Sequence, residues 1–125
     1  MNLNQVTVSV SDVERSISFY EQLGLKLIVK SLPHYARFEC PQGDATFSLH
    51  HCDEAQKENA VWIYFEVEDI DRHVQQLIDK GIIFETLAED KPWLWREARL
   101  KDPDYHLLII YHAGEKKRPA VADLI

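Results

Sequence analysis

The chain has 125 residues, of which 46% are apolar and 28% charged, as expected for one globular domain. Acidic side chains outnumber basic ones by 21 to 14, and a net charge of −7 disfavours nucleic acid as a partner. No apolar run reaches the ~18 residues of a membrane helix, and Met1 leads into polar residues rather than a signal peptide. Cys40 and Cys52 match neither a zinc spacing nor a disulfide framework. We therefore expect a soluble, cytoplasmic protein that binds neither membranes nor nucleic acid.

The first half of the chain predicts a strand, a helix and three more strands. Residues 5–10 alternate polar and apolar side chains, which is typical of a half-buried strand. Ser11 and Glu14 form a capping-box pair, and the apolar stripe that follows ends at Gly24. Further strands are expected at 25–30, 34–40 and 45–51.

The second half predicts the same order of elements. Residues 52–60 are polar and indicate a linker. A strand is expected at 61–67, followed by a helix over about 69–80 that ends at Gly81. The last three strands are expected at 82–87, 94–101 and 105–111.

Two stretches of sequence repeat in the same order. Val10–Arg15 is matched in kind by Val67–Arg72, 57 positions further on. Ala36–Phe38 is matched by Ala98–Leu100, 62 positions further on, so the second copy is longer by about five residues. The chain is therefore predicted to be a duplicated β-α-β-β-β unit.

Residues 8–20 (VSVSDVERSISFY), 23–25 (LGL) and 100–104 (LKDPD) resemble the vicinal oxygen chelate superfamily, which includes glyoxalases, bleomycin-resistance proteins and extradiol dioxygenases. The resemblance covers about residues 3–113. It implies an α+β fold of two βαβββ modules, with sheets curled into an open barrel around a shared cleft and helices outside. The expected parts of this single domain are a first module at about 3–51, a linker at 52–60, a second module at 61–113 and a tail at 114–125.

Strand alternation predicts which side chains face that cleft, because apolar neighbours such as Ala36 and Phe38 suit the helix side. The candidate ligand-binding residues are Gln5, Arg37, His50, Trp62, Tyr64, Trp95, Glu97, Arg99 and Tyr111. Flat aromatic surface and two arginine forks favour a planar or anionic organic ligand.

Two of these assignments have structural alternatives. In one, Arg37 and Arg99 pair internally with Glu39, Glu97 or Glu66, which satisfies buried charge without a ligand. In the other, His50 is simply a hydrogen-bonded or half-solvated histidine at a strand end.

The resemblance also implies four metal-ligand positions, which fall on Gln5, Ser48, Trp62 and Ile109 in this chain. Gln5 is an acceptable ligand, Ser48 a poor one, and tryptophan and isoleucine are not ligands. No metal and no cofactor are therefore expected. The alternative is a displaced divalent-metal site in which Gln5 and His50 combine with Glu39 and Glu97.

The leading functional hypothesis is metal-independent binding of a small organic molecule, with no catalytic residue identified. The alternatives are a metal-dependent lyase, isomerase or dioxygenase, and an accessory or regulatory domain that binds a ligand without catalysis. The resemblance further implies a homodimer. The tryptophan-rich insertion at residues 91–97 suits a lid, a dimer contact or core packing.

Overall fold

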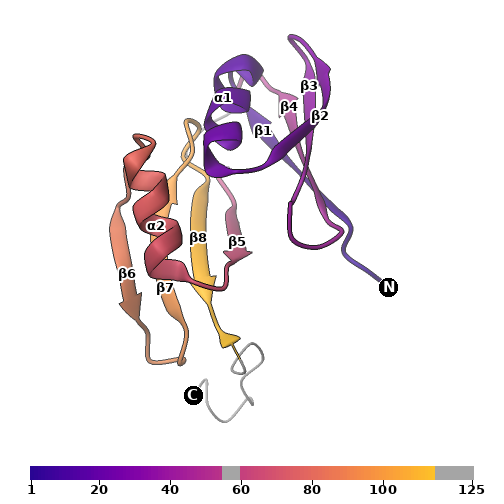
Figure 1. Ribbon diagram of the computed structural model, residues 1–125. Coiled ribbons are helices and arrows are strands. Elements are labelled where there is room, and N and C mark those ends of the chain that lie inside the picture. Colours follow the sequence, from indigo (N-terminus) through magenta and orange to yellow (C-terminus); the bar gives the residue numbers. More distant parts are fainter. Residues whose placement is uncertain (55–59, 115–125) are drawn as a thin grey trace. The chain divides into compact units, whose positions relative to one another are not determined.

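The computed structural model describes residues 1–54 and 60–114, which form two compact units. The first unit comprises Met1–Val61 together with Asp102–His106, and the second comprises Trp62–Lys101 and the chain from Leu107 onward. Each unit holds one helix and one four-stranded sheet, so the α+β class and the duplicated βαβββ order are confirmed (Figure 1). Most of the predicted linker (55–59) and tail (115–125) lies outside the described residues.

In the first unit the sheet order is β1-β4-β3-β2, with β1 parallel to β4 and the other pairs antiparallel. Its elements are β1 (Gln5–Val10), α1 (Val13–Leu23), β2 (Lys26–Ser31), β3 (Tyr35–Glu39) and β4 (Thr46–His51).

The second unit repeats this arrangement with the order β5-β8-β7-β6, and β5 is parallel to β8. Its elements are β5 (Trp62–Glu66), α2 (Ile70–Asp79), β6 (Thr86–Asp90), β7 (Arg96–Lys101) and β8 (Leu107–His112).

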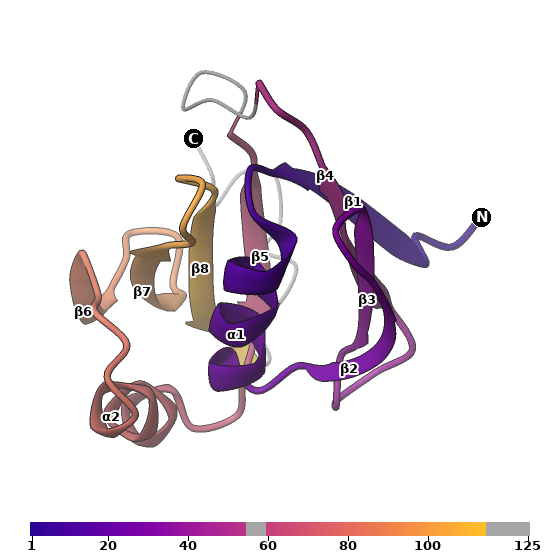
Figure 2. The same ribbon diagram turned by 90° about the horizontal axis from the view of Figure 1, so that it is seen from above.

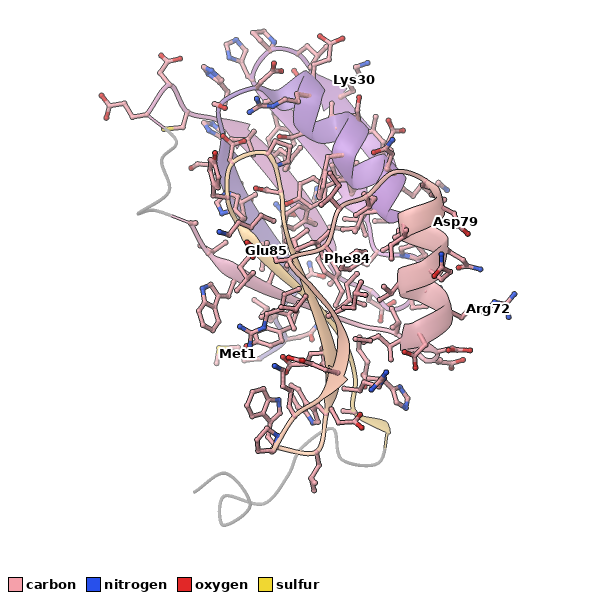
Figure 3. All side chains as sticks on the ribbon, turned by 90° about the vertical axis from the view of Figure 1, so that its left-hand side faces the viewer. Met1, Lys30, Arg72, Asp79, Phe84 and Glu85 are labelled. Atoms are coloured by element: carbon pink, nitrogen blue, oxygen red, sulfur yellow. The ribbon has the colours of Figure 1, made fainter. Side chains whose placement is uncertain are left out.

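Each helix packs its apolar stripe on one face of its own sheet. In α1 the buried Tyr20 ring lies 4.8 Å from the ring of Phe47 on β4. In α2 the buried stripe is Ile70, Val74 and Leu77, and the helix lies along strands β6, β7 and β8 (Figure 2). The polar side chains of Arg72 and Asp79 point away from the sheet (Figure 3). The sheet face opposite each helix is called here the helix-free face of that unit.

The start of α1 differs from the prediction by one residue. Asp12 is the N-cap, and its Oδ1 accepts the backbone N–H of Arg15 at 3.0 Å. The hydroxyl of Ser11 instead donates to Asp104 at 2.7 Å. Serine and aspartate are both good caps, so this tertiary contact decides between them. The predicted end is confirmed, since Gly24 has a φ of +111°.

The second strand of the second unit also begins later than predicted. A strand was expected at 82–87, but β6 starts at Thr86. Ile82 closes the end of α2 instead: its N–H donates to Leu77 and its side chain is buried. Within the described residues, no helix is long and apolar enough to cross a membrane.

Candidate functional site

Cross-strand pairing places the predicted residues of the first unit on its helix-free face. Residues that pair directly across a sheet point their side chains to the same side. Three such rows run across strands β1, β4 and β3: Gln5–Thr46–Glu39, Thr7–Ser48–Arg37 and Ser9–His50–Tyr35. The opposite face carries Phe38, Phe47 and Leu49, which are buried on the helix side. Gln5, Arg37 and His50 therefore lie on the sheet face where alternation placed them, and their role in binding a ligand stays a prediction.

The second unit has the same arrangement with different side chains. Its rows across strands β5, β8 and β7 are Trp62–Leu107–Lys101, Tyr64–Ile109–Arg99 and Glu66–Tyr111–Glu97. Trp95 reaches the same face, because its ring stacks on that of Tyr111 with centroids 4.5 Å apart and planes 19° from parallel. The two arginines thus occupy the same place in the two sheets, in the middle row of the third strand.

Arg37 is held by a neutral partner. Its guanidinium donates to Oε1 of Gln5, which also accepts the hydroxyl of Thr46 at 3.0 Å. The expected alternative, an ion pair with Glu39, is not among the contacts of the described residues. The Nε of Arg37 is buried and has no hydrogen-bond partner within the part of the chain that the structure describes.

Arg99 is held by a buried acid. One of its terminal nitrogens lies 3.5 Å from Oε2 of Glu97, which confirms one of the expected internal pairs. The Glu97 side chain is 1% exposed, and its Oε1 accepts the indole N–H of Trp93 at 2.7 Å. The guanidinium carbon of Arg99 lies 5.8 Å from the ring centroid of Trp62. Among the described residues, its Nε too is buried without a partner.

Aromatic rings cover much of the helix-free face of the second unit. Trp62 is 64% exposed and Tyr64 46% exposed, which is high for side chains of this size. Tyr64 also meets Tyr111 edge to face, with centroids 5.9 Å apart. Exposed aromatic surface of this kind is typical of a binding surface.

His50 and Gln5 share a face but lie in different rows. His50 pairs with Ser9, whereas Gln5 pairs with Thr46, four residues back along β4. Four residues of strand span about 13 Å. The structure therefore does not bring together the two residues on which the displaced metal site depends. His50 is exposed near the end of β4, as its structural alternative expected.

The side chains at the positions implied for a metal do not fit one. Trp62 and Ile109 have no donor atom for a cation, and the hydroxyl of Ser48 is taken up by that of Tyr35 at 2.8 Å. The oxygen of Gln5 is engaged by Arg37 and Thr46. A guanidinium thus occupies the oxygen that a metal would need. Across residues 1–54 and 60–114, no three His, Cys, Asp or Glu side chains come together as a metal-binding group.

A hollow of about 380 Å³ lies at the turn between β3 and β4, lined in part by Lys26, Glu39, Cys40 and Thr46. Burial raises the pKa of the Cys40 thiol, so this cysteine stays protonated and is a poor nucleophile. None of the predicted ligand-binding residues lines this hollow.

Sequence reasoning missed a buried polar centre in the first unit. The hydroxyl of Tyr20 donates to Asp102 at 2.6 Å, and the other oxygen of Asp102 accepts the N–H groups of Asp104 and His106. Burial raises the Asp102 pKa, which the bond from Tyr20 lowers in part. The pKa of Tyr20 is raised well above its ordinary value, by burial and by the charge of Asp102. The Asp-Pro-Asp turn was visible in the sequence, but its partner on α1 was not.

With this geometry in place, comparison with known proteins identifies the family. Residues 2–110 match the model of the Glyoxalase/Bleomycin resistance protein/Dioxygenase superfamily, and the chain belongs to it. The resemblance seen in the sequence is therefore confirmed.

The individual relatives described next are each less than 30% identical to this chain. The uncharacterized protein YraH of Bacillus subtilis (strain 168) is 29% identical over 127 residues, covering 89% of this chain and 98% of its own. A glyoxalase/bleomycin resistance protein/dioxygenase from Nocardioides has a TM-score of 0.78 at 20% identity, covering 96% of this chain and 88% of the other. A bleomycin-binding protein, solved in complex with bleomycin, has a TM-score of 0.74 at 19% identity, covering 91% and 99%. At these identities the two structures show the fold alone.

Proposed function

We propose that this protein binds small planar or anionic organic molecules at an arginine on the helix-free face of each unit, Arg37 in the first and Arg99 in the second, without a metal or cofactor. The observation that carries the proposal is a pair of buried Nε groups, without a partner among residues 1–54 and 60–114, at matching places on the two helix-free faces. A buried N–H without a partner is costly, and a carboxylate or phosphate oxygen is the partner that a guanidinium binds best. Because both Nε atoms are buried, a ligand engages them when the guanidinium turns outward, and the Arg99 side chain is already 28% exposed.

The surroundings of Arg99 support a ligand with a flat ring. Trp62 and Tyr64 expose their rings in the two rows that hold Lys101 and Arg99. A ring stacked on such side chains gains about 0.5–1.5 kcal/mol beyond its buried area. The bleomycin-binding protein, which shares this fold, is an example of a relative that binds a small organic molecule.

We further propose that the protein acts in the cytoplasm as a homodimer.

Benzoate and 2-naphthoate are suitable probes, with affinity measured by isothermal titration calorimetry. We expect both to bind, and the larger ring to bind more tightly. Arg37→Gln should weaken binding to the first unit, and Arg99→Gln binding to the second, each about tenfold or more, the equivalent of one charge-assisted hydrogen bond. Arg72→Gln is the matched control, because Arg72 lies on the outer side of α2 (Figure 3).

Two results would contradict the proposal. One is binding of either probe that persists unchanged when both arginines are replaced. The other is stoichiometric divalent metal in the purified protein, measured by elemental analysis and lost in His50→Ala, which would favour the metal-dependent alternative.

A further inference from the structure

The two matched arginines differ in what a ligand must displace. The partner of Arg37 is the neutral amide oxygen of Gln5, whereas the partner of Arg99 is the carboxylate of Glu97. An anion that binds Arg37 competes with a neutral oxygen. An anion that binds Arg99 competes with another anion.

Loss of the ion pair with Arg99 would be costly for Glu97, because Glu97 is buried. Its side chain is 1% exposed while Arg99 is in place, so water does not share in its solvation. If Arg99 turns toward a ligand, Oε2 of Glu97 is left without a charged partner, and the indole N–H of Trp93 still serves only Oε1. A buried carboxylate that loses its partner is strongly destabilised. A simple anion therefore binds Arg99 at the expense of Glu97.

A ligand can avoid this penalty by bringing a donor of its own. An N–H group next to the acid group would donate to Oε2 of Glu97 while the acid takes the guanidinium. The contact between Arg99 and Glu97 is long for a charge-assisted hydrogen bond, at 3.5 Å, so a ligand donor that comes closer to Oε2 can compete with it.

We propose that the helix-free face of the second unit selects aromatic acids that carry an N–H donor beside the acid group. The proposal rests on the proposed function and names its ligand class. The acid binds Arg99, the donor binds Glu97, and the ring lies against the exposed aromatic side chains Trp62 and Tyr64. Trp93 is a positioning residue, because it holds the other oxygen of Glu97 in place.

The test compares two probes of nearly equal shape. The amino group of 2-aminobenzoate donates a hydrogen bond, and the methyl group of 2-methylbenzoate does not. We expect 2-aminobenzoate to bind about tenfold more tightly or better, as one hydrogen bond to a charged acceptor predicts. Nuclear magnetic resonance should also show a shift of the Trp93 indole N–H signal, assigned with Trp93→Phe, on addition of 2-aminobenzoate.

Glu97→Gln gives the matched variant. Its amide oxygen can still accept from Trp93, while its amide nitrogen replaces the acceptor that faces Arg99. We expect 2-methylbenzoate to bind more tightly to this variant and 2-aminobenzoate to bind less tightly, so that the preference disappears. A merely structural role of Glu97 would weaken both probes together.

The outcomes separate this inference from the function on which it rests. Equal affinity of the two probes for the native protein, or tighter binding of 2-methylbenzoate, overturns the inference and leaves the proposed function standing. Failure of both probes to bind overturns both. Because this comparison uses the native protein, it decides the question even if Glu97→Gln does not fold.

Discussion

The helix-free faces of the two units place an arginine at the same point and surround it differently. Arg37 shares its row with the small polar side chains of Thr7 and Ser48. Arg99 shares the matching row with Tyr64 and Ile109. Strand register thus sets where the charge lies, and the neighbouring side chains determine what that charge can bind.

The helices differ as well. Tyr20 of α1 and Leu77 of α2 occupy matching positions, 57 residues apart in the sequence. Both are buried, but Tyr20 donates a hydrogen bond to Asp102, whereas Leu77 contributes an apolar side chain. The first unit therefore contains a buried carboxylate whose ionisation is coupled to folding, and the helix of the second unit has no such group at the matching position.

Tyr20→Phe should have the largest effect on stability, because it removes the donor and leaves the ring. A hydrogen bond to a charged group contributes about 1.5–3 kcal/mol, so we expect a loss of this size in the free energy of unfolding at pH 7. Urea denaturation followed by circular dichroism measures it. Tyr64→Phe is the control, since Tyr64 is exposed on the second unit and should lose almost nothing.

The same variant makes a prediction about pH. Burial raises the Asp102 pKa, so this group favours the folded state most below the ordinary aspartate value of about 3.9 and less as pH rises through its folded pKa. The hydrogen bond from Tyr20 lowers the Asp102 pKa and so stabilises the ionised form of Asp102. The cost of Tyr20→Phe should therefore be full at neutral pH and shrink in acid. A cost that does not change with pH would contradict this account.

Much of the fold could be predicted because successive side chains of a strand point to one or the other of only two sheet faces. Once Ala36 and Phe38 are assigned to the helix side, Arg37 must lie on the other face, and the structure agrees. The predicted start of α1 was wrong because a distant contact decided it. Ser11 does not cap α1 because Asp104 takes its hydroxyl, and no local pattern in the sequence reveals that partner.

The candidate site could be predicted as a set of side chains but not as a set of contacts. Gln5 and Arg37 lie in neighbouring rows, and their contact depends on how a long side chain is turned. The bond from Trp93 to Glu97 depends on the turn before β7, where Leu94 has a φ of +75°. Side-chain rotamers and turn conformations of this kind depend on tertiary packing, so alternation along a strand does not predict these contacts.

Gln5→Glu tests the comparison directly, because it gives Arg37 the kind of partner that Arg99 has. We expect the affinity for benzoate to fall about tenfold, since the ligand must now displace a carboxylate. Gln5→Met is the control: it removes the acceptor without adding charge and should leave the affinity equal or higher. An unchanged affinity in Gln5→Glu would mean that the charge of the residue bonded to Arg37 does not affect how tightly Arg37 binds an anion.

The smallest effect is expected at an exposed ion pair of the second unit. Arg96 on β7 binds Asp71 in the first turn of α2 at 2.8 and 3.2 Å, and it also binds Asp90 at 3.1 Å. The hydrogen bond from Arg96 lowers the Asp71 pKa. This stabilisation is therefore present above the ordinary aspartate value of about 3.9 and is lost as pH falls through the lowered folded pKa.

Asp71→Asn should lower the melting temperature slightly at pH 7 and low salt, by less than Tyr20→Phe does, because exposed ion pairs contribute little. The decrease should narrow in 1 M salt, where the Debye length is about 3 Å, and disappear in strong acid. Glu14→Gln on α1 is the matched control: both substitutions remove a negative charge from the first turn of a helix, so their difference isolates the contribution of Arg96. If the two variants lose the same amount, the helix dipole accounts for the whole effect, and the ion pair on the second unit adds nothing to its stability.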